Sequence, residues 1–376
     1  MKLIECVPNF SEGQDRRIIQ AISDAISHIP SVRLLHVDPS IDANRTVMTF
    51  VGEPAQVGEA AVRAIAKAAD LIDMSRHQGS HPRQGATDVC PFVPLSGVEM
   101  AACIELAREV GARVGDELGI PVYLYGEAAT KGERRSLAAL RRGEYEGLPA
   151  KMAQPEWRPD FGPADFKPKA GATAIGARKI LIAFNVCLDT EDVSQAQDIA
   201  KAIRERGGLA RDSDGQVMRD DEGHPIRREG SLKACRAMGW WMPTYRCAQV
   251  SMNLEDYRRT PPHIALEEVR RQAHARNLGV TGSELVGMIP LEAMLMAGRY
   301  YATRAGLSQE CTEEELVTRA VDAMELSAVK SFQLERDILE YRLREDGGSW
   351  AQWSEEMLAS QPLINHGIGK NSANPE

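Results

Sequence analysis

The stretch KILIAFNVCLDTEDVSQAQDIAKAIRER, residues 179–206, decides how the chain is divided. Residues 179–188 form an apolar run of strand length, and residues 193–206 place apolar side chains at the spacing of an amphipathic helix. The chain opens in the same way. A strand at 3–7 leads to Asn9 and is followed by a turn and a helix at 16–27, just as the later strand contains Asn185 and is followed by a turn and a helix. We therefore predict a first domain over 1–178, a second over 179–330 and a C-terminal extension over 331–376.

Short β-like runs and amphipathic helices alternate through both predicted domains, which indicates α+β units. Further strands are expected at 33–37, 45–51, 122–125 and 248–253, and further helices at 56–71, 98–118, 263–277 and 313–328. The combination Gly147-Leu148-Pro149 predicts a helix stop, followed by a loop to Gly176 that is long enough to suggest a function. Residues 211–230 are polar and are expected to be an exposed loop, and the tail after Glu345 is expected to fray.

Composition narrows the class of protein. The 376 residues are 43% apolar and 26% charged, which is the balance of a folded globular chain of two or three domains. The net charge of −9 argues against a nucleic-acid partner. The seven cysteines are scattered without a Cys-x-x-Cys pair, and no apolar run approaches the roughly 20 residues of a membrane span. No signal peptide is visible at the start, so we expect a cytoplasmic protein without a membrane partner.

The densest cluster of reactive side chains is RHQGSHPRQG, residues 76–85. Gly79 and Pro82 interrupt any helix there, so a structured loop with two histidines and two arginines is predicted. A neutral imidazole suits proton transfer, and arginine suits carboxylate recognition. A solvated basic loop is the plain alternative. A metal site is disfavoured, because the spacing of His77 and His81 brings ligands together only in a helix, so we expect no metal.

Two other segments contain residues that could bind a ligand. GATAIGARK, residues 171–179, resembles a phosphate loop only superficially, since it lacks the Gly-Lys-Ser/Thr ending and precedes a strand, which leaves a ligand loop or a structural turn. Asp38, Asp42, Asn44 and Arg45 surround a strand turn, where Asp and Asn are ordinary turn formers. The residues alone therefore predict a small-molecule site on loops, with histidine as the base, and leave the substrate open.

Eight segments, in order, resemble the formiminotransferase family. They are ECVPNFSEG (5–13), NRTVMTFVG (44–52), LIDMSRHQGSHPRQGATDVCPFVP (71–94), PVYLYGEAA (121–129), RRGEYEGL (141–148), PDFGP (159–163), GATAIGARKILIAFNV (171–186) and GSELVGMIP (282–290). The resemblance covers residues 2–330. It implies two α+β subdomains, each a β-sheet covered by helices, with a ligand groove between them. It also implies a homodimer, and a chain that ends before a fused cyclodeaminase domain.

The resemblance further implies transfer of a formimino group from N-formimidoyl-L-glutamate to the co-substrate tetrahydrofolate, a step of histidine degradation and one-carbon metabolism. His81 of the His-Pro-Arg motif corresponds to the family's catalytic histidine, and Asp38 would orient or electrostatically tune it. Charge complementarity adds Arg76, Arg83 and Arg178 as partners for substrate carboxylates. The folate-binding stretch corresponds to Gly162, Pro163, Ala164, Asp165, Phe166, Lys167, Pro168, Lys169, Ala170 and Gly171.

Three other functions remain compatible with these motifs. The same residues would serve formyl transfer between 5-formyltetrahydrofolate and glutamate, since they do not distinguish =NH from =O on the transferred carbon. A hydrolase that cleaves formimidoylglutamate would act without folate. A non-catalytic folate-binding protein would bind folate without turnover, although the intact His81 motif argues against it.

Overall fold

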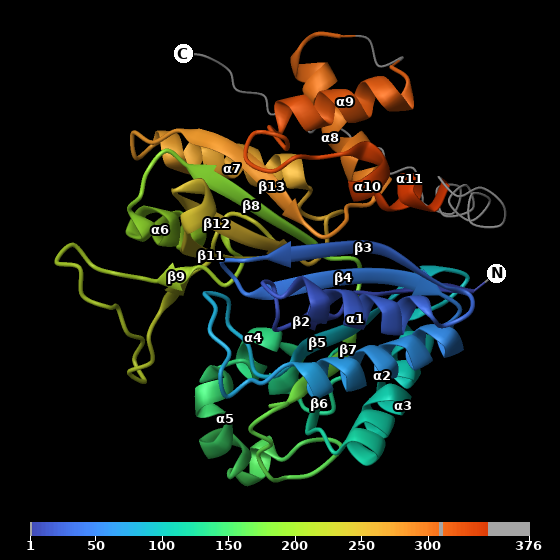
Figure 1. Ribbon diagram of the computed structural model, residues 1–376. Coiled ribbons are helices and arrows are strands. Elements are labelled where there is room, and N and C mark those ends of the chain that lie inside the picture. The colour runs from blue at the N-terminus through green and yellow to red at the C-terminus, as the bar shows by residue number, and fades with distance from the viewer. Residues whose placement is uncertain (1, 308–310, 345–376) are drawn as a thin grey trace, which may run out of the picture.

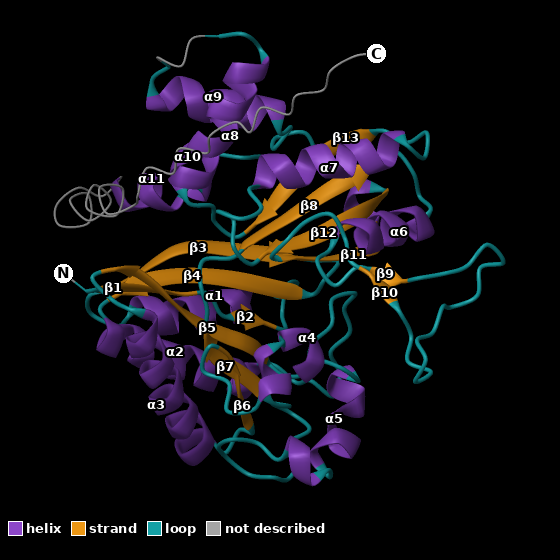
Figure 2. Ribbon diagram, turned by 180° about the vertical axis from the view of Figure 1, so that it is seen from behind, coloured by secondary structure: helices purple, strands orange, loops and turns teal. Residues whose placement is uncertain are grey.

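The computed structural model describes residues 2–307 and 311–344. These residues form two layered units, each with a β-sheet whose outer face is covered by helices (Figures 1 and 2). The inner faces of the two sheets lie toward each other. The predicted α+β class with two sheet-and-helix units is therefore confirmed.

The first sheet is mostly antiparallel. Its order across the sheet is β3 (Val32–Ser40), β4 (Arg45–Gly52), β1 (Leu3–Cys6) with β2 (Asn9–Phe10), β5 (Thr87–Ser96), β7 (Thr173–Ala177) and β6 (Val122–Gly126). Both β1 and β2 lie between β4 and β5, so they are two consecutive segments of one interrupted strand. Within this sheet, the two parallel pairings are β5 with β7 and β7 with β6.

Helices cover the outer face of the first sheet and part of its inner face. α1 (Arg16–Ser27), α2 (Pro54–Leu71) and α3 (Met100–Leu118) pack on the outer face, and α4 (Leu137–Leu140) and α5 (Glu144–Met152) cover the inner side of β5, β7 and β6. The bounds of α1 match the predicted helix, and the Asp15 side chain caps it by accepting from the amide of Arg17. The inner side of β1–β4 stays free to meet the second sheet.

The second sheet is antiparallel, in the order β11 (Cys235–Met242), β12 (Cys247–Leu254), β8 (Ile182–Leu188) and β13 (Val280–Val286). Its outer face packs under α6 (Val193–Ile203), α7 (Pro262–His274) and α8 (Leu291–Arg304), and α9 (Glu313–Ala323) packs on α8. In β8, Phe184 and Val186 point to this core, while Asn185 between them points inward. The alternation follows from the two-residue period of a strand.

After α9 the chain returns to the first unit. Residues 330–344, here called the C-terminal strap, contain α10 (Leu334–Asp337) and α11 (Leu339–Arg344). Leu339 and Leu343 of the strap pack against Leu35 on β3. The guanidinium of Arg33 donates to the carbonyl oxygen of Arg342 at 2.7 Å. The rest of the predicted extension, including the tail expected to fray, lies outside the described residues.

The expected loop before Gly176 is partly wrong. α5 continues through Pro149 to Met152, because burial of Leu148 and Met152 against the sheet outweighs the hydrogen bond that proline cannot make. Residues 173–177 form strand β7, which lies between β5 and β6, rather than a ligand loop or a turn. Their small side chains fit a crowded position, since a Cβ at Gly176 would lie 2.3 Å from the carbonyl oxygen of Tyr125.

The predicted exposure of residues 211–230 is confirmed. The ribbon of β9 (Gly208–Leu209) and β10 (Arg227–Arg228) carries this segment away from the body of the protein (Figure 1). Short 3-10 turns occur at Gly132–Arg135, Pro155–Trp157 and Pro243–Tyr245. Within the described part of the chain, no helix has the length and apolar character needed to cross a bilayer.

Candidate active site

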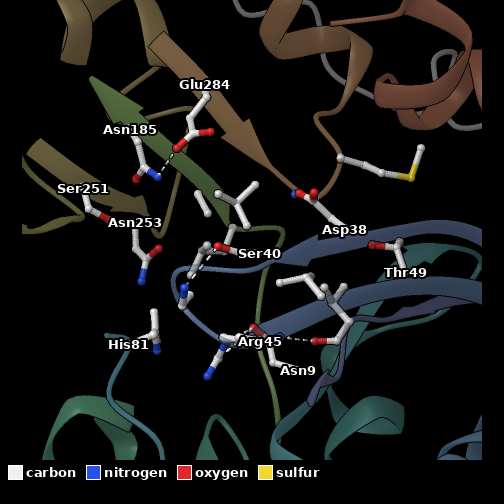
Figure 3. A pocket seen from close by; sticks show the side chains of 18 of the residues that line it. Asn9, Asp38, Ser40, Arg45, Thr49, His81, Asn185, Ser251, Asn253 and Glu284 are labelled. Atoms are coloured by element: carbon white, nitrogen blue, oxygen red, sulfur yellow. Dashed lines mark hydrogen bonds between the residues drawn. The ribbon is translucent and has the colours of Figure 1, made fainter. Parts of the chain in front are cut away.

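The inner faces of the two sheets are polar where they meet. Residues at every second position of β1, β4, β8 and β12 line a cavity between the sheets, among them Glu5 on β1. Figure 3 shows others of this set, namely Arg45, Thr49, Asn185, Ser251 and Asn253. The cavity has a volume of about 350 Å³, within the usual range for small-molecule sites. Two sheets joined by an apolar layer would form one core, so polar inner faces indicate a ligand site.

His81 lines this cavity from the loop between α2 and β5. Its Nδ1 lies 2.8 Å from the carbonyl oxygen of Pro82 and must donate to it, because a carbonyl only accepts. The Trp240 ring of the second sheet meets the imidazole edge-on, with centroids 6.1 Å apart. Burial, followed by the charges of Arg45 and Arg141, holds the pKa of His81 well below the ordinary value of 6.5. His81 is therefore neutral at pH 7, with the lone pair on Nε2.

An aspartate network lies beside His81. Asp88 of β5 is fully buried, and its carboxylate accepts from Arg45 at 2.6 Å and from Arg141 at 2.5 Å. Arg45 also donates to the side-chain oxygen of Asn9 at 2.7 and 2.9 Å. Burial alone would raise the pKa of Asp88, but Arg141 and Arg45 outweigh burial and lower it to about 2. Burial lowers the pKa of Arg45 to about 10, so both partners stay charged at pH 7.

Asp38 lies in the same cavity, on a different side from His81 (Figure 3). Both of its carboxylate oxygens accept from the Lys330 ammonium at 2.8 Å, and one also accepts from the amide of Gly287 at 3.0 Å. These contacts join β3 of the first unit to the second unit and the strap. Among the described residues, no hydrogen bond connects Asp38 to His81.

The three predicted substrate arginines are placed differently. Arg178 lines the cavity close to Glu5. Arg83 is buried outside the cavity, and its guanidinium already pairs with Glu144 and Glu146. Arg76 is exposed in the turn after α2 and does not line the cavity.

The predicted folate stretch, residues 162–171, lies behind the His81 loop. The end of this stretch is hydrogen-bonded to that loop, since the amide of Ala86 donates to the carbonyl oxygen of Ala170 at 2.8 Å. Gly171 has a φ of 66°, and a Cβ there would lie 2.2 Å from the carbonyl oxygen of Gln84, so the close approach requires glycine. None of these ten residues lines the cavity described above.

Two further carboxylates of the cavity, Glu5 and Glu284, were not predicted from the sequence. Burial raises the pKa of Glu5 to about 7, with Arg178 opposing part of the rise. Glu284 accepts from Asn185 at 3.1 Å, from Gln249 at 3.0 Å and from the Tyr245 hydroxyl at 2.8 Å. A buried charged residue inside a short strand, as Glu5 is within LIEC and Glu284 within VTGSELV, is the signal that could have identified them.

The fold and cavity define a class of protein with a small-molecule cavity between two sheets, beside a neutral histidine. Residues 3–178 match the formiminotransferase domain, N-terminal subdomain, and residues 183–344 match the formiminotransferase domain. The chain belongs to the formiminotransferase family.

Named relatives extend this result. The chain is 40% identical to the glutamate formimidoyltransferase of Thermoplasma acidophilum, over 86% of this chain and 99% of the relative. It is 39% identical to that of Streptococcus pyogenes serotype M1, over 80% and 93%. It is 46% identical to the formimidoyltransferase-cyclodeaminase of Dictyostelium discoideum over 92% of this chain. The chain spans 61% of that relative and 65% of the Sus scrofa protein, less than two thirds of either.

Proposed function

We propose that the protein transfers the formimino group from N-formimidoyl-L-glutamate to tetrahydrofolate, giving 5-formimidoyltetrahydrofolate and L-glutamate. The observation that carries the proposal is the neutral His81 beside Arg45 and Arg141 in a cavity between two polar sheets. The names of the two relatives that the chain covers almost completely support the same reaction.

His81 acts as the general acid and base. Nε2 accepts the proton released from N5 of the folate as the bond from N5 to the formimino carbon forms. His81 then returns this proton to the glutamate nitrogen as the bond from that nitrogen to the same carbon breaks. A positioned base of this kind contributes about 10²–10⁴-fold to the rate.

Cations at the cavity wall bind the substrate carboxylates. Arg45, Arg141 and Arg178 line the cavity, whereas Arg83 lies outside it and pairs with two glutamates. Arginine forks match the geometry of carboxylates, so these three residues fit the glutamate portion of either substrate. The amide side chains of Asn185 and Asn253 offer donors and acceptors to uncharged polar edges such as a pterin ring.

Turnover of N-formimidoyl-L-glutamate with tetrahydrofolate tests the proposal, with the folate product detected after acid conversion to its methenyl form. A parallel reaction contains 5-formyltetrahydrofolate and glutamate. Product in the first reaction that disappears in His81→Ala supports formimino transfer. Activity in the second reaction alone would identify a formyltransferase, turnover without folate would identify a hydrolase, and folate binding without turnover would identify a binding protein.

The same proposal includes a homodimer that works in the cytoplasm, as the family resemblance implies. Light scattering of the purified chain would give a mass of twice 41.3 kDa if the dimer forms. Fractionation of cells that express the chain would test the compartment.

A further inference from the structure

Asp88 connects three elements at the wall of the cavity. One carboxylate oxygen accepts from Arg45 of β4 and from Arg141, which follows α4. The other accepts from the backbone amide of Gln84 at 3.1 Å, in the loop that carries His81. The side chain of Asp88 has no exposed surface, so these bonds are shielded from water and from salt.

The two arginines keep capacity for a further anion. Arg45 and Arg141 both line the cavity, while Asp88 itself does not. Two positive charges share one carboxylate, which leaves one unit of positive charge at the wall beside His81. The Nε of Arg141 is buried without a partner in the described part of the chain. A carboxylate of the substrate would complete this arrangement.

The charges that act on the His81 imidazole come from the same three residues. Arg45 and Arg141 disfavour the imidazolium, and Asp88 favours it. Trp240, which faces His81 from the second sheet, has an uncharged ring. Burial is the largest influence on the pKa of His81, and the balance among Asp88 and its two arginines adjusts the basicity of Nε2 beyond it.

We propose that Asp88 is a positioning residue for the reaction proposed above, on which this inference rests. By holding Arg45, Arg141 and the Gln84 amide together, Asp88 fixes the cationic site for the substrate carboxylate and sets the charge beside His81. Asp88 does not line the cavity, so it acts through these partners and through the charge that it places near His81.

A second buried pair supplies a matched control. The Asp160 carboxylate accepts from Arg134 at 2.8 Å and from the amide of Leu124 at 2.9 Å, so it pairs with an arginine and a backbone amide as Asp88 does, but with one arginine instead of two. Neither Asp160 nor Arg134 lines the cavity. Asp160→Asn therefore reproduces the loss of a buried ion pair without changing the charge beside His81.

The test is an NMR titration of the His81 imidazole in the full chain, in the wild type, Asp88→Asn, Arg141→Gln and Asp160→Asn. Asp88→Asn removes the negative charge, so the pKa of His81 should fall by about one pH unit, a usual effect of one nearby charge. Arg141→Gln removes a positive charge, so the pKa should rise by about the same amount. Asp160→Asn should leave it unchanged.

Kinetics provide the second readout. Both Asp88→Asn and Arg141→Gln should raise KM for formimidoylglutamate about tenfold, and Asp160→Asn should not. Identical His81 titrations in Asp88→Asn and Asp160→Asn, or shifts of the same sign in Asp88→Asn and Arg141→Gln, would overturn the proposal. If Asp88→Asn does not fold, Arg141→Gln decides alone, and an unshifted titration counts against the proposal. The titration needs no turnover, so it stays decisive even if the proposed reaction fails.

Discussion

The cavity has two ends that are built differently. At the histidine end, defined by His81, Arg45 and Arg141, the bonds between the two units are exposed, such as that from the amide of Thr244 to Asp42 at 3.0 Å. At the lysine end, defined by Asp38 and Lys330, they are partly buried and continue into the C-terminal strap. The buried contacts that join the two units and the residues proposed for catalysis therefore lie at different ends of the cavity. Each set can be altered without the other.

The largest effect is expected at the histidine end. His81→Ala should lower kcat by about 10²–10⁴-fold while folate binding remains, because the base is lost and the cavity is not. Steady-state kinetics together with folate titration measure both quantities. His77 is the matched histidine, since its Nε2 bonds the carbonyl of Asn44 and its Nδ1 accepts from Arg83. His77→Gln should reduce stability rather than kcat, and an equal loss of kcat in both variants would contradict the assignment.

A smaller effect is expected at the lysine end. Lys330→Met leaves the Asp38 carboxylate with the Gly287 amide alone, which should lower the free energy of unfolding by about 1–3 kcal/mol. Urea unfolding measures this loss. Asp38→Asn should produce a similar loss, and the double variant should lose less than the sum because the two residues share one interaction.

Those same variants test whether Asp38 tunes His81. In the wild type, the pKa of His81 lies below 6.5, so kcat/KM should stay on its plateau as pH falls to that value and decline only at lower pH, when Nε2 becomes protonated. The acid limb of the pH profile should be the same in Asp38→Asn, because Asp38 is occupied by Lys330. A shift of that limb in Asp38→Asn would instead support the predicted tuning role of Asp38.

The smallest effect concerns Glu5. Its pKa in the folded protein is raised to about 7 from 4.5, so the fold favours the protonated carboxyl. The stability that this group contributes is complete below pH 4.5 and is lost as pH rises through 7. Glu5→Gln should therefore raise Tm by about 2 °C at pH 8 and change little at pH 4.5. Glu133 is exposed, and Glu133→Gln should show no such pH dependence in the same thermal scans.

The elements with clear periodicity could be predicted from sequence. The apolar spacing of residues 16–27 and of residues 193–203 identified α1 and α6, because one buried helical face repeats every 3.6 residues. β5 could not be identified in this way, since Pro91 and Pro94 interrupt it. β7 was missed because four of its five residues have small side chains, which suit a crowded position between two strands.

The same distinction holds for the candidate site: residues in a local sequence pattern could be predicted, and residues brought together from distant parts of the chain could not. His81 stood out because its loop concentrates reactive residues within a short stretch. The network around Asp88 depends on pairs 43 and 53 residues apart, with Arg45 and Arg141, and no local pattern reports such pairs. Lys330 lies 292 residues from Asp38, and only the return of the strap brings them together.

That return has a consequence for how the protein is made. A ribosome that adds roughly 5–20 residues per second needs roughly 15–60 s to proceed from Asp38 to Lys330. Throughout that interval the inner edge of β3 has no Leu339 or Leu343 to cover Leu35, and the Asp38 carboxylate has no counter-ion. The nascent first unit thus exposes a half-apolar sheet surface of the kind that chaperones bind, and translation must pass the strap before the cavity can close.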